Sequence, residues 1–247
     1  MRKINLIPMA GEGKRFLNDG YKIPKPLIRI NGTPMFVYAA KSLPKADQFI
    51  FICLKKHVKK YKINKEIKNF FPKAKVIILD KLTNGQATTC LKAEKILKKN
   101  DILTIGACDN AMIYNQKKLD KKINKSDLVI WTFKDDKIVS NNSNMYGYVK
   151  VKKPDNASYV SCKKTISKTP GNDHTIIGAF SFKKAETFLK YSRNLIKNNK
   201  RINNEFYLDS VADLCVSSGL KVKVNLVKKY IGWGTPKDFV DNKKIKN

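Results

Sequence analysis

Short apolar runs alternate with segments of helical periodicity over the first 140 residues. The runs with the length and composition of buried strands are Ile4–Pro8, Gln48–Leu54, Lys75–Leu79, Ile102–Ala107 and Asp127–Phe133. The segments with helical spacing are Pro34–Ser42, His57–Phe71, Ala87–Leu97 and Leu119–Ile123. This strand–helix alternation predicts an α/β fold with a parallel, doubly wound sheet. Ligands of such sheets bind beyond the carboxyl ends of the strands.

The pattern changes after about residue 140. The segments Tyr146–Lys152, Ser158–Cys162 and His174–Phe182 predict antiparallel strands that cover the ligand crevice, and Lys221–Leu226 predicts a closing strand. Helices are expected at Ala185–Lys190 and Asn204–Ser217, and a last one after the turn Gly232–Pro236. Because no repeat or linker divides the chain, we expect a single domain over residues 1–242 and a frayed tail at 243–247.

Glycines and cations follow the first predicted strand. Ala10, Gly11 and Gly13 end the apolar run, Arg15 follows at once, and Lys25 lies between two prolines. Glycine has no Cβ, so backbone N–H groups there can approach an anion closely. A guanidinium suits phosphate oxygens, and prolines stiffen the backbone around a lysine. The segment predicts a phosphate-binding loop, with a tight turn beside surface cations as the alternative.

The run Gly11-Glu12-Gly13-Lys14-Arg15, followed by Pro24-Lys25-Pro26-Leu27, resembles the N-terminal motif of the sugar-nucleotide pyrophosphorylases, G-x-G-[ST]-R and then P-K-P-[LM]. Lys14 stands where that family has Ser or Thr. The resemblance implies a Rossmann-like fold of the GT-A type: a mixed, mostly parallel sheet flanked by helices, with a small antiparallel portion. It also implies a nucleotidyltransferase that joins a nucleoside triphosphate to a sugar phosphate, of the capsule or lipopolysaccharide type.

Transfer of a nucleotidyl group needs cations and a metal-binding carboxylate more than a side-chain nucleophile. Asp109 directly follows the predicted strand Ile102–Ala107, so it is expected at the crevice, where Mg²⁺ would bridge phosphates. An Asp-Asn turn is the alternative. The resemblance supports the metal site, because the family has Gly-Asp-Asn here and this chain has Cys108-Asp109-Asn110.

The loop that precedes the helix at Ala87–Leu97 carries Gly85 and Gln86. The resemblance places the nucleotide base against this loop. An amide has both a donor and an acceptor and can pair with a pyrimidine edge, which favours UTP, CTP or dTTP. A helix-capping loop is the alternative.

The resemblance also implies an acceptor subsite. Gly147 and Gly178 match the two family segments that line the sugar pocket, and Lys163 matches the lysine that holds the sugar phosphate. The family's neighbouring glutamate, which contacts sugar hydroxyls, is replaced by Cys162. The expected acceptor is therefore a sugar 1-phosphate or another phosphorylated polyol.

Many relatives place a second magnesium carboxylate just before a Gly-Thr pair near the C-terminus, and this chain lacks it. Mg²⁺ would then rely on Asp109, phosphates and water, since it needs few protein ligands. Glu205 and Asp209 are the alternative second carboxylates.

The amino-acid composition does not alter the predicted fold or function. The net charge of +31 is mostly lysine and is spread over all 247 residues, which indicates a solvated basic surface that attracts anionic substrates. Site-specific phosphate or base contacts favour arginine, so no specific nucleic-acid partner is expected. The five scattered cysteines predict reduced thiols, and no apolar run reaches the roughly 20 residues of a membrane span. These features favour a cytoplasmic protein.

Two other function classes are open. A GT-A glycosyltransferase that uses a nucleotide sugar would share the sheet, but it normally carries an Asp-x-Asp motif, which is missing here. A non-enzymatic polyanion-binding protein would explain the charge but not the segment from Gly11 to Lys25. The acceptor, the base of the triphosphate and homo-oligomerisation are not fixed by the sequence.

Overall fold

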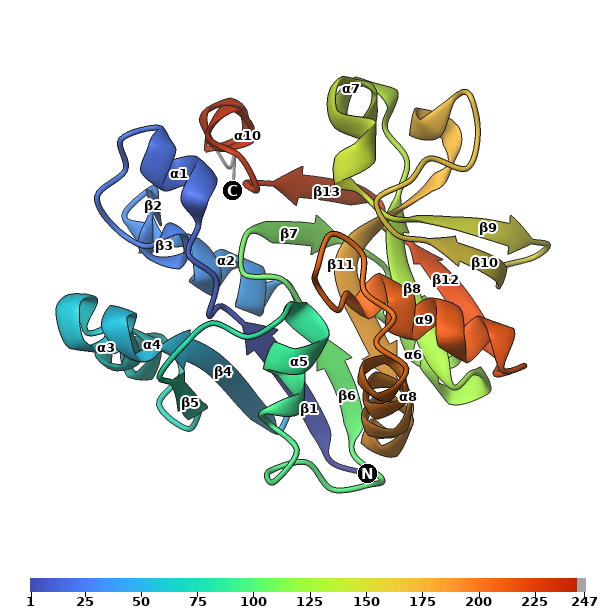
Figure 1. Ribbon diagram of the computed structural model, residues 1–247, viewed down its shortest axis with the longest axis horizontal. Coiled ribbons are helices and arrows are strands. Elements are labelled where there is room, and N and C mark those ends of the chain that lie inside the picture. The colour runs from blue at the N-terminus through green and yellow to red at the C-terminus, as the bar shows by residue number, and fades with distance from the viewer. Residues whose placement is uncertain (244–247) are drawn as a thin grey trace.

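A nine-stranded mixed sheet forms the centre of the protein (Figure 1). The computed structural model describes residues 1–243, apart from the side chain of Asn141, so most of the predicted tail lies outside the described residues. In spatial order the strands are β5 (Lys75–Leu79), β4 (Gln48–Leu54), β1 (Lys3–Pro8), β6 (Ile102–Ile105), β11 (His174–Phe182), β8 (Leu128–Phe133), β12 (Val222–Leu226), β10 (Asn156–Ser161) and β9 (Tyr148–Lys152).

The predicted parallel arrangement holds for the first four strands, since β5, β4, β1 and β6 are all parallel. Beyond them β11 runs antiparallel between β6 and β8, and β10 and β9 add antiparallel pairs. The prediction that His174–Phe182 only covers the crevice is therefore wrong. Seven of its nine residues are buried, which requires neighbours on both edges and both faces of the strand.

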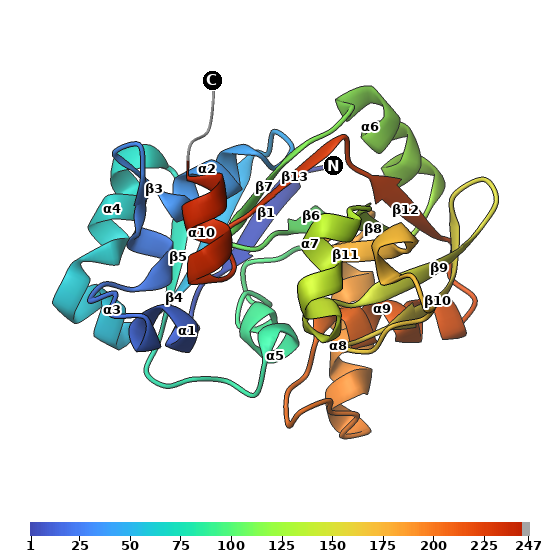
Figure 2. The same ribbon diagram turned by 90° about the horizontal axis from the view of Figure 1, so that it is seen from above.

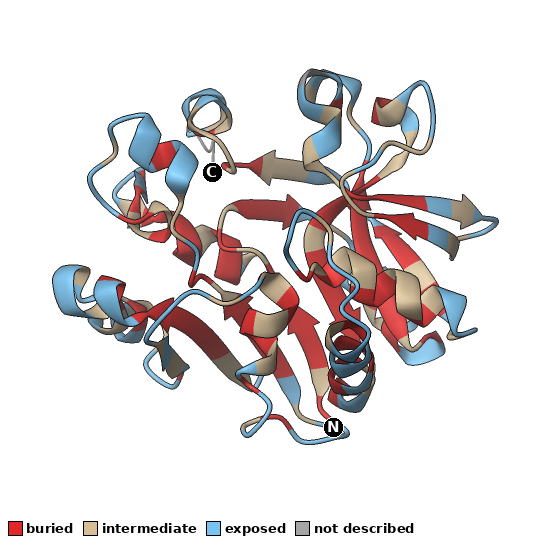
Figure 3. Ribbon diagram, viewed as in Figure 1, coloured by how far each residue is buried: buried red, intermediate tan, exposed pale blue. Residues whose placement is uncertain are grey.

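Alternation along the strands sends side chains into two cores. In β1, Ile4 and Leu6 pack with the helices α5 (Gln86–Leu91), α8 (Ala185–Lys197) and α9 (Leu208–Ser217). Ile7 points to the other face and packs with the helices α2 (Met35–Lys41), α4 (Ile63–Phe70) and α6 (Gln116–Lys125). The view from above shows the two helical layers, and the buried residues follow the strands between them (Figures 2 and 3). Each fully buried Leu, Ile or Phe contributes about 1.5–3 kcal/mol.

Several helices differ from the predicted segments. Lys62 adopts a left-handed conformation (φ +52°) and divides His57–Phe71 into α3 (Lys55–Tyr61) and α4. The helix expected at Ala87–Leu97 ends at Leu91 and continues as turns, whereas α8 extends seven residues beyond the predicted Lys190. The remaining elements are α1 (Lys14–Asn18), η1 (Lys25–Leu27), β2 (Arg29–Ile30), β3 (Thr33–Pro34), α7 (Asp136–Val139), η2 (Ser140–Met145), η3 (Pro170–Asn172) and α10 (Pro236–Asn242).

A pair of short strands joins distant parts of the chain. β7 (Asn110–Ile113) pairs antiparallel with β13 (Lys229–Gly232), so Gly232 lies opposite Asn110. The pairing brings the C-terminal segment beside Asp109, whose carbonyl accepts a 2.8 Å hydrogen bond from the backbone N–H of Trp233. Neither strand was predicted.

A small apolar cluster lies beneath the predicted phosphate loop, and we call it the loop cluster. It consists of Phe16, Ile28, Ile30, Met35, Ala111, Trp233 and Phe239. In that order, these residues lie in α1, just before β2, in β2, in α2, in β7, just after β13 and in α10. The cluster therefore fixes α1 and α10 relative to β7.

Within the described residues, none of the helices has the length and apolar character that a membrane crossing requires.

Candidate active site

The loops after β1, β5 and β6 meet at one cleft, as the doubly wound pattern predicts. One cavity of about 400 Å³ is lined by the Gly11–Lys14 loop, the 82–86 loop and Glu205. A second cavity of about 200 Å³ adjoins it, because Gly11, Gly13 and Gln86 line both. Lys25 and Asp109 line the second cavity.

Gly13 is the position in the predicted phosphate loop whose backbone conformation favours glycine. Its φ of +68° is left-handed, and a Cβ built there would lie 3.2 Å from the Cβ of Lys25. A side chain at residue 13 would therefore be strained by the backbone conformation and would crowd the Lys25 turn. Arg15 projects from α1 into solvent, and its guanidinium has no hydrogen-bond or ion-pair partner among the described residues.

Lys25 and Asp109 form an ion pair at the floor of the second cavity. The Nζ of Lys25 donates to Oδ2 of Asp109 at 2.5 Å, and the two side chains are 20% and 21% exposed. Burial acts to lower the pKa of Lys25, but Asp109 outweighs it, and the net pKa lies above its ordinary value. The ammonium group is thus kept charged while one side of the pair stays open to a ligand.

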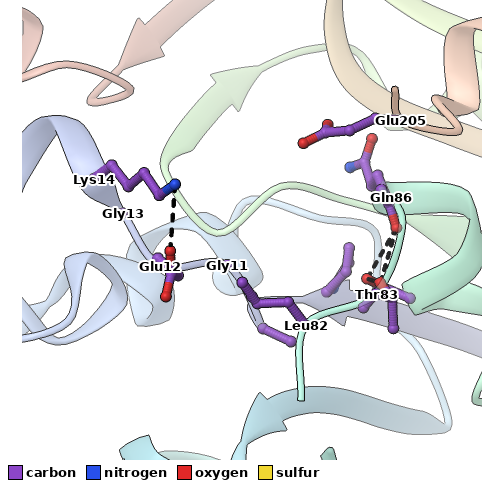
Figure 4. Close-up of a pocket in the computed structure, with 12 residues that line it drawn as sticks. Gly11, Glu12, Gly13, Lys14, Leu82, Thr83, Gln86 and Glu205 are labelled. Atoms are coloured by element: carbon purple, nitrogen blue, oxygen red, sulfur yellow. Dashed lines mark hydrogen bonds and ion pairs between the residues drawn. The ribbon is translucent and has the colours of Figure 1, made fainter. Parts of the chain in front are cut away.

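Gly85 and Gln86 line the first cavity, and Gln86 also lines the second. Gly85 has a φ of +108°, and a Cβ there would come within 2.5 Å of the backbone nitrogen of Phe206. Phe206 donates its N–H to the carbonyl of Asn84 at 2.8 Å. Glu205 therefore lies next to Gln86, and Figure 4 shows both side chains extending into the cavity.

The predicted acceptor residues gather in two places. A Cβ on Gly147 would overlap the carboxylate of Asp209, and the Nζ of Lys163 donates to the carbonyl of Met145. Lys163 and Asp209 also interact electrostatically, so Gly147, Lys163 and Asp209 form one group. Gly178 lies elsewhere: it adopts a φ of +84° beside Ala107, in the loop that carries Asp109.

Asp209 is a destabilising group at neutral pH. Burial raises its pKa to about 6 from an ordinary 3.8, although Lys163 and the Cys162 thiol act to lower it. Between these two pH values the folded protein holds a proton that the unfolded chain has released. The folding stability therefore falls as the pH rises through this window and stays at the lower level above it.

The variant Asp209→Asn is expected to be more stable than the wild type at pH 7.5 by about 1–3 kcal/mol, because it removes a carboxylate that is costly to ionise. Urea unfolding at pH 5 and pH 7.5 measures the difference, which should be larger at pH 7.5. Asp19→Asn, at an exposed position, is the matched control. A variant that is less stable than the wild type at pH 7.5 would contradict this account.

Asp238 is a candidate second magnesium carboxylate that our sequence analysis missed. A Cβ on Gly234 would lie 3.7 Å from Oδ2 of Asp109 and 4.0 Å from Oδ2 of Asp238, so the two carboxylates face the same space. Thr235 and Asp238 form the capping box of α10. That Thr-Pro-x-Asp spacing was visible in the sequence and could have placed the aspartate at this helix start.

The carboxylates fit a magnesium site of few protein ligands. Oxygen donors on Asp109 and Asp238 are the ligands that Mg²⁺ prefers, and the remaining positions suit phosphates and water. The described residues contain no group of three or more His, Cys, Asp or Glu that would hold a metal by itself. Glu205 lies instead with Gln86, and Asp209 with Lys163.

The family model of the nucleotidyl transferases matches residues 4–244. The chain belongs to this family. The resemblance that was inferred from the Gly11–Arg15 and Pro24–Leu27 motifs is thus confirmed at the level of the family, and the protein is a nucleotidyltransferase. A comparison with curated protein sequences finds no match.

Solved structures share the fold of this nucleotidyltransferase. The nucleoside-diphosphate-sugar pyrophosphorylase from Vibrio cholerae RC9 superimposes with a TM-score of 0.79 at 18% identity, over 98% of this chain and 100% of that one. The inositol-1-phosphate CTP transferase from T. maritima gives 0.72 at 14% identity, over 96% and 91%. The UTP-bound UGPase from Acinetobacter baumannii gives 0.71 at 17%, over 98% and 92%.

Proposed function

We propose that this nucleotidyltransferase joins a pyrimidine nucleoside triphosphate to a sugar 1-phosphate or another phosphorylated polyol and releases pyrophosphate. The observation that carries the proposal is the Lys25–Asp109 pair, which lines a cavity against the glycine loop. A cation and a carboxylate that face one space suit a metal-bound triphosphate, and the N–H groups of the Gly11–Gly13 loop beside them have no partner within the described part of the chain. The names of the similar structures, which include sugar and inositol phosphate transferases, support this acceptor class.

The reaction is an in-line displacement at the α-phosphorus. An oxygen of the acceptor phosphate forms the new bond, the bond to the bridging oxygen of the β-phosphate breaks, and pyrophosphate leaves with that electron pair. No side-chain nucleophile is required. Gly11 and Gly13 would cradle the triphosphate with backbone N–H groups, and Arg15 would hold its phosphate oxygens. Lys25 would balance the negative charge that develops at the α-phosphate.

Magnesium would be held by Asp109, with Asp238 as the second carboxylate, and it would neutralise phosphate charge. Lys163 would place the acceptor phosphate, and Gly147, which has no side chain, lets the Asp209 carboxylate approach the same group. We further propose, from the family resemblance, that the product serves surface polysaccharide synthesis in the cytoplasm. We also propose that residues 1–242 form a single nucleotidyltransferase domain.

The variant Arg15→Ala is expected to lower kcat/KM for the triphosphate by about 10²-fold, because the loss of a charged, two-point contact to phosphate costs about 3 kcal/mol. Arg15→Lys keeps the charge without the planar fork and should recover part of the loss. Neither arginine lines the two cavities, but Arg15 follows the Gly11–Lys14 loop directly, whereas Arg29 pairs with Glu66 at 2.8 Å. Arg29→Ala is therefore the control. Equal activity of Arg15→Ala and the control would remove Arg15 from the site.

Pyrophosphate release tests the function as a whole. The protein is incubated with Mg²⁺, each nucleoside triphosphate and a panel of sugar 1-phosphates and phosphorylated polyols. We expect release only when both substrates are present. A glycosyltransferase would instead release a nucleoside diphosphate from a nucleotide sugar, and a polyanion-binding protein would release nothing. Either result would contradict the proposal.

A further inference from the structure

Strand β11 contains a bulge next to the second cavity. The register between β11 and β8 shifts at residues 177–179, so that these three residues lie opposite a single residue of β8. Gly178, at the centre of the bulge, has a left-handed φ of +84° and lies beside Ala107. Ala107 and Asp109 both line the second cavity. The bulge therefore lies against the loop that forms one wall of that cavity.

The side chain of Asn110 joins the bulge to this loop. Its Nδ2 donates to the carbonyl of Ile177 at 3.0 Å, and the residue is only 2% exposed. Residues in a bulge are left out of the regular strand pairing, so a buried carbonyl there needs a partner from elsewhere. The partner must be a donor, which an amide provides and a carboxylate of the same size does not.

The backbone around Asn110 is held to a third segment. Asn110 pairs with Gly232 in the β7–β13 ladder, and the carbonyl of Asp109 accepts a 2.8 Å hydrogen bond from the N–H of Trp233. The Asp109 loop is thus fixed to the C-terminal segment by its backbone and to β11 by the Asn110 side chain. The side-chain link can therefore be removed by substitution while the backbone link remains.

The other polar atom of the Asn110 amide lacks a partner. Its Oδ1 is buried and makes no hydrogen bond within the described part of the chain. An unpaired buried carbonyl oxygen lowers stability, and an apolar residue of similar shape would not carry this cost. The cost argues that the amide is retained for the bond that Nδ2 makes to the bulge.

We propose that Asn110 is a positioning residue for nucleotidyl transfer, because its amide sets the position of the Asp109 loop relative to the Gly178 bulge. The inference rests on the proposed function, in which Asp109 serves the triphosphate and Gly178 is expected on the acceptor side. Asn110 is buried, so it acts through the two segments that it joins. A displacement of about 1 Å between reacting groups can lower a rate by about 10²-fold.

The test measures steady-state pyrophosphate release by Asn110→Ala, with acceptor and triphosphate varied in turn. We expect kcat/KM for the acceptor to fall by about 10²-fold. The KM for the triphosphate should change by less than about threefold, because the glycine loop and Lys25 are untouched. Asn110→Leu removes the same donor while filling the space, and it should show the same loss.

Asn5→Ala is the matched control. Asn5 is also 2% exposed, and its Nδ2 donates to the carbonyl of Pro44 at 2.7 Å. Asn5 lies in the first half of β1, and it lines neither cavity of the site. Both alanine variants lose a buried bond from an amide to a carbonyl, so their Tm values should fall by similar amounts. Asn5→Ala should nevertheless keep the wild-type kcat/KM for the acceptor.

Gly178→Ala perturbs the other end of the link, because a Cβ is strained at the left-handed φ of Gly178. It should lower kcat/KM for the acceptor and leave the KM for the triphosphate nearly unchanged. The double variant with Asn110→Ala should lose less than the product of the two single losses, since both changes act through one bulge.

The outcomes separate this inference from the proposed function. An undiminished acceptor kcat/KM in folded Asn110→Ala or Asn110→Leu, an equal loss in Asn5→Ala, or a fully additive double variant would overturn the role of Asn110 and leave the proposed function standing. If neither Asn110 variant folds, a Gly178→Ala variant with wild-type acceptor kcat/KM would overturn it. Absence of pyrophosphate release by the wild type with every pair of substrates would overturn both.

Discussion

Replacement of Lys25 by alanine is expected to lower kcat by about 10²–10³-fold, the loss that follows removal of one preorganised group that stabilises transition-state charge. The ammonium group is held 2.5 Å from Asp109 and is already charged before substrate arrives, so no reorganisation is needed during the reaction. The KM for the triphosphate should change less than kcat, since the charge balanced by Lys25 is greatest in the transition state.

Lys22→Ala is the matched control for Lys25. Lys22 is exposed three residues earlier, and its backbone carbonyl, not its side chain, accepts a hydrogen bond from the Tyr61 hydroxyl. Steady-state pyrophosphate release should be unchanged in this variant. Circular dichroism and thermal unfolding of Lys25→Ala should match the wild type within a few degrees, because the Asp109 carboxylate it leaves is partly exposed. Full activity of a folded Lys25→Ala would remove the ion pair from the mechanism.

Replacement of Asp109 by asparagine is expected to lower turnover by about 10³-fold, because metal stabilisation of phosphate charge is worth several kcal/mol. The second readout is metal binding itself: Mn²⁺, used as a probe with bound nucleotide and followed by electron paramagnetic resonance, should bind at least tenfold more weakly. Asp238→Asn should also weaken Mn²⁺ binding, but less than Asp109→Asn does, because the Asp238 carboxylate already accepts a hydrogen bond in the capping box of α10.

Asp80→Asn is the control for Asp109. Asp80 is an exposed carboxylate that pairs with Lys55 at 2.6 Å, and neither residue lines the cavities of the site. This variant should bind Mn²⁺ and turn over as the wild type does. Undiminished Mn²⁺ affinity in Asp109→Asn would place the metal elsewhere.

The parts of the site that were predicted from the sequence share one property. The phosphate loop and Asp109 each directly follow an apolar strand, and parallel strands end at the same edge of a sheet. The sequence pattern of each strand, together with the rule that ligands bind beyond the carboxyl ends of parallel strands, is therefore enough to predict that Lys25 and Asp109 meet, although they are 84 residues apart.

The parts that were not predicted depend on long-range pairing. β7 and β13 have four residues each and pair across more than 100 residues, so neither carries enough local pattern to indicate its partner. Asp238 becomes relevant only through that pairing. The central position of β11 was missed for a related reason: its apolar run fits a covering strand and a central one equally well, and only the partners β6 and β8 decide between them.

The loop cluster makes the reaction centre depend on the C-terminal end of the described chain. Phe16 packs edge-on against Phe239, 6.3 Å between ring centres, and Trp233 hydrogen-bonds through its indole nitrogen to the carbonyl of Asn242. Seven apolar residues are few compared with either main core, so this corner can open while the large sheet stays intact. We therefore expect mild heat or denaturant to inactivate the enzyme before the main sheet unfolds, and a bulky fusion placed after α10 to lower activity more than stability.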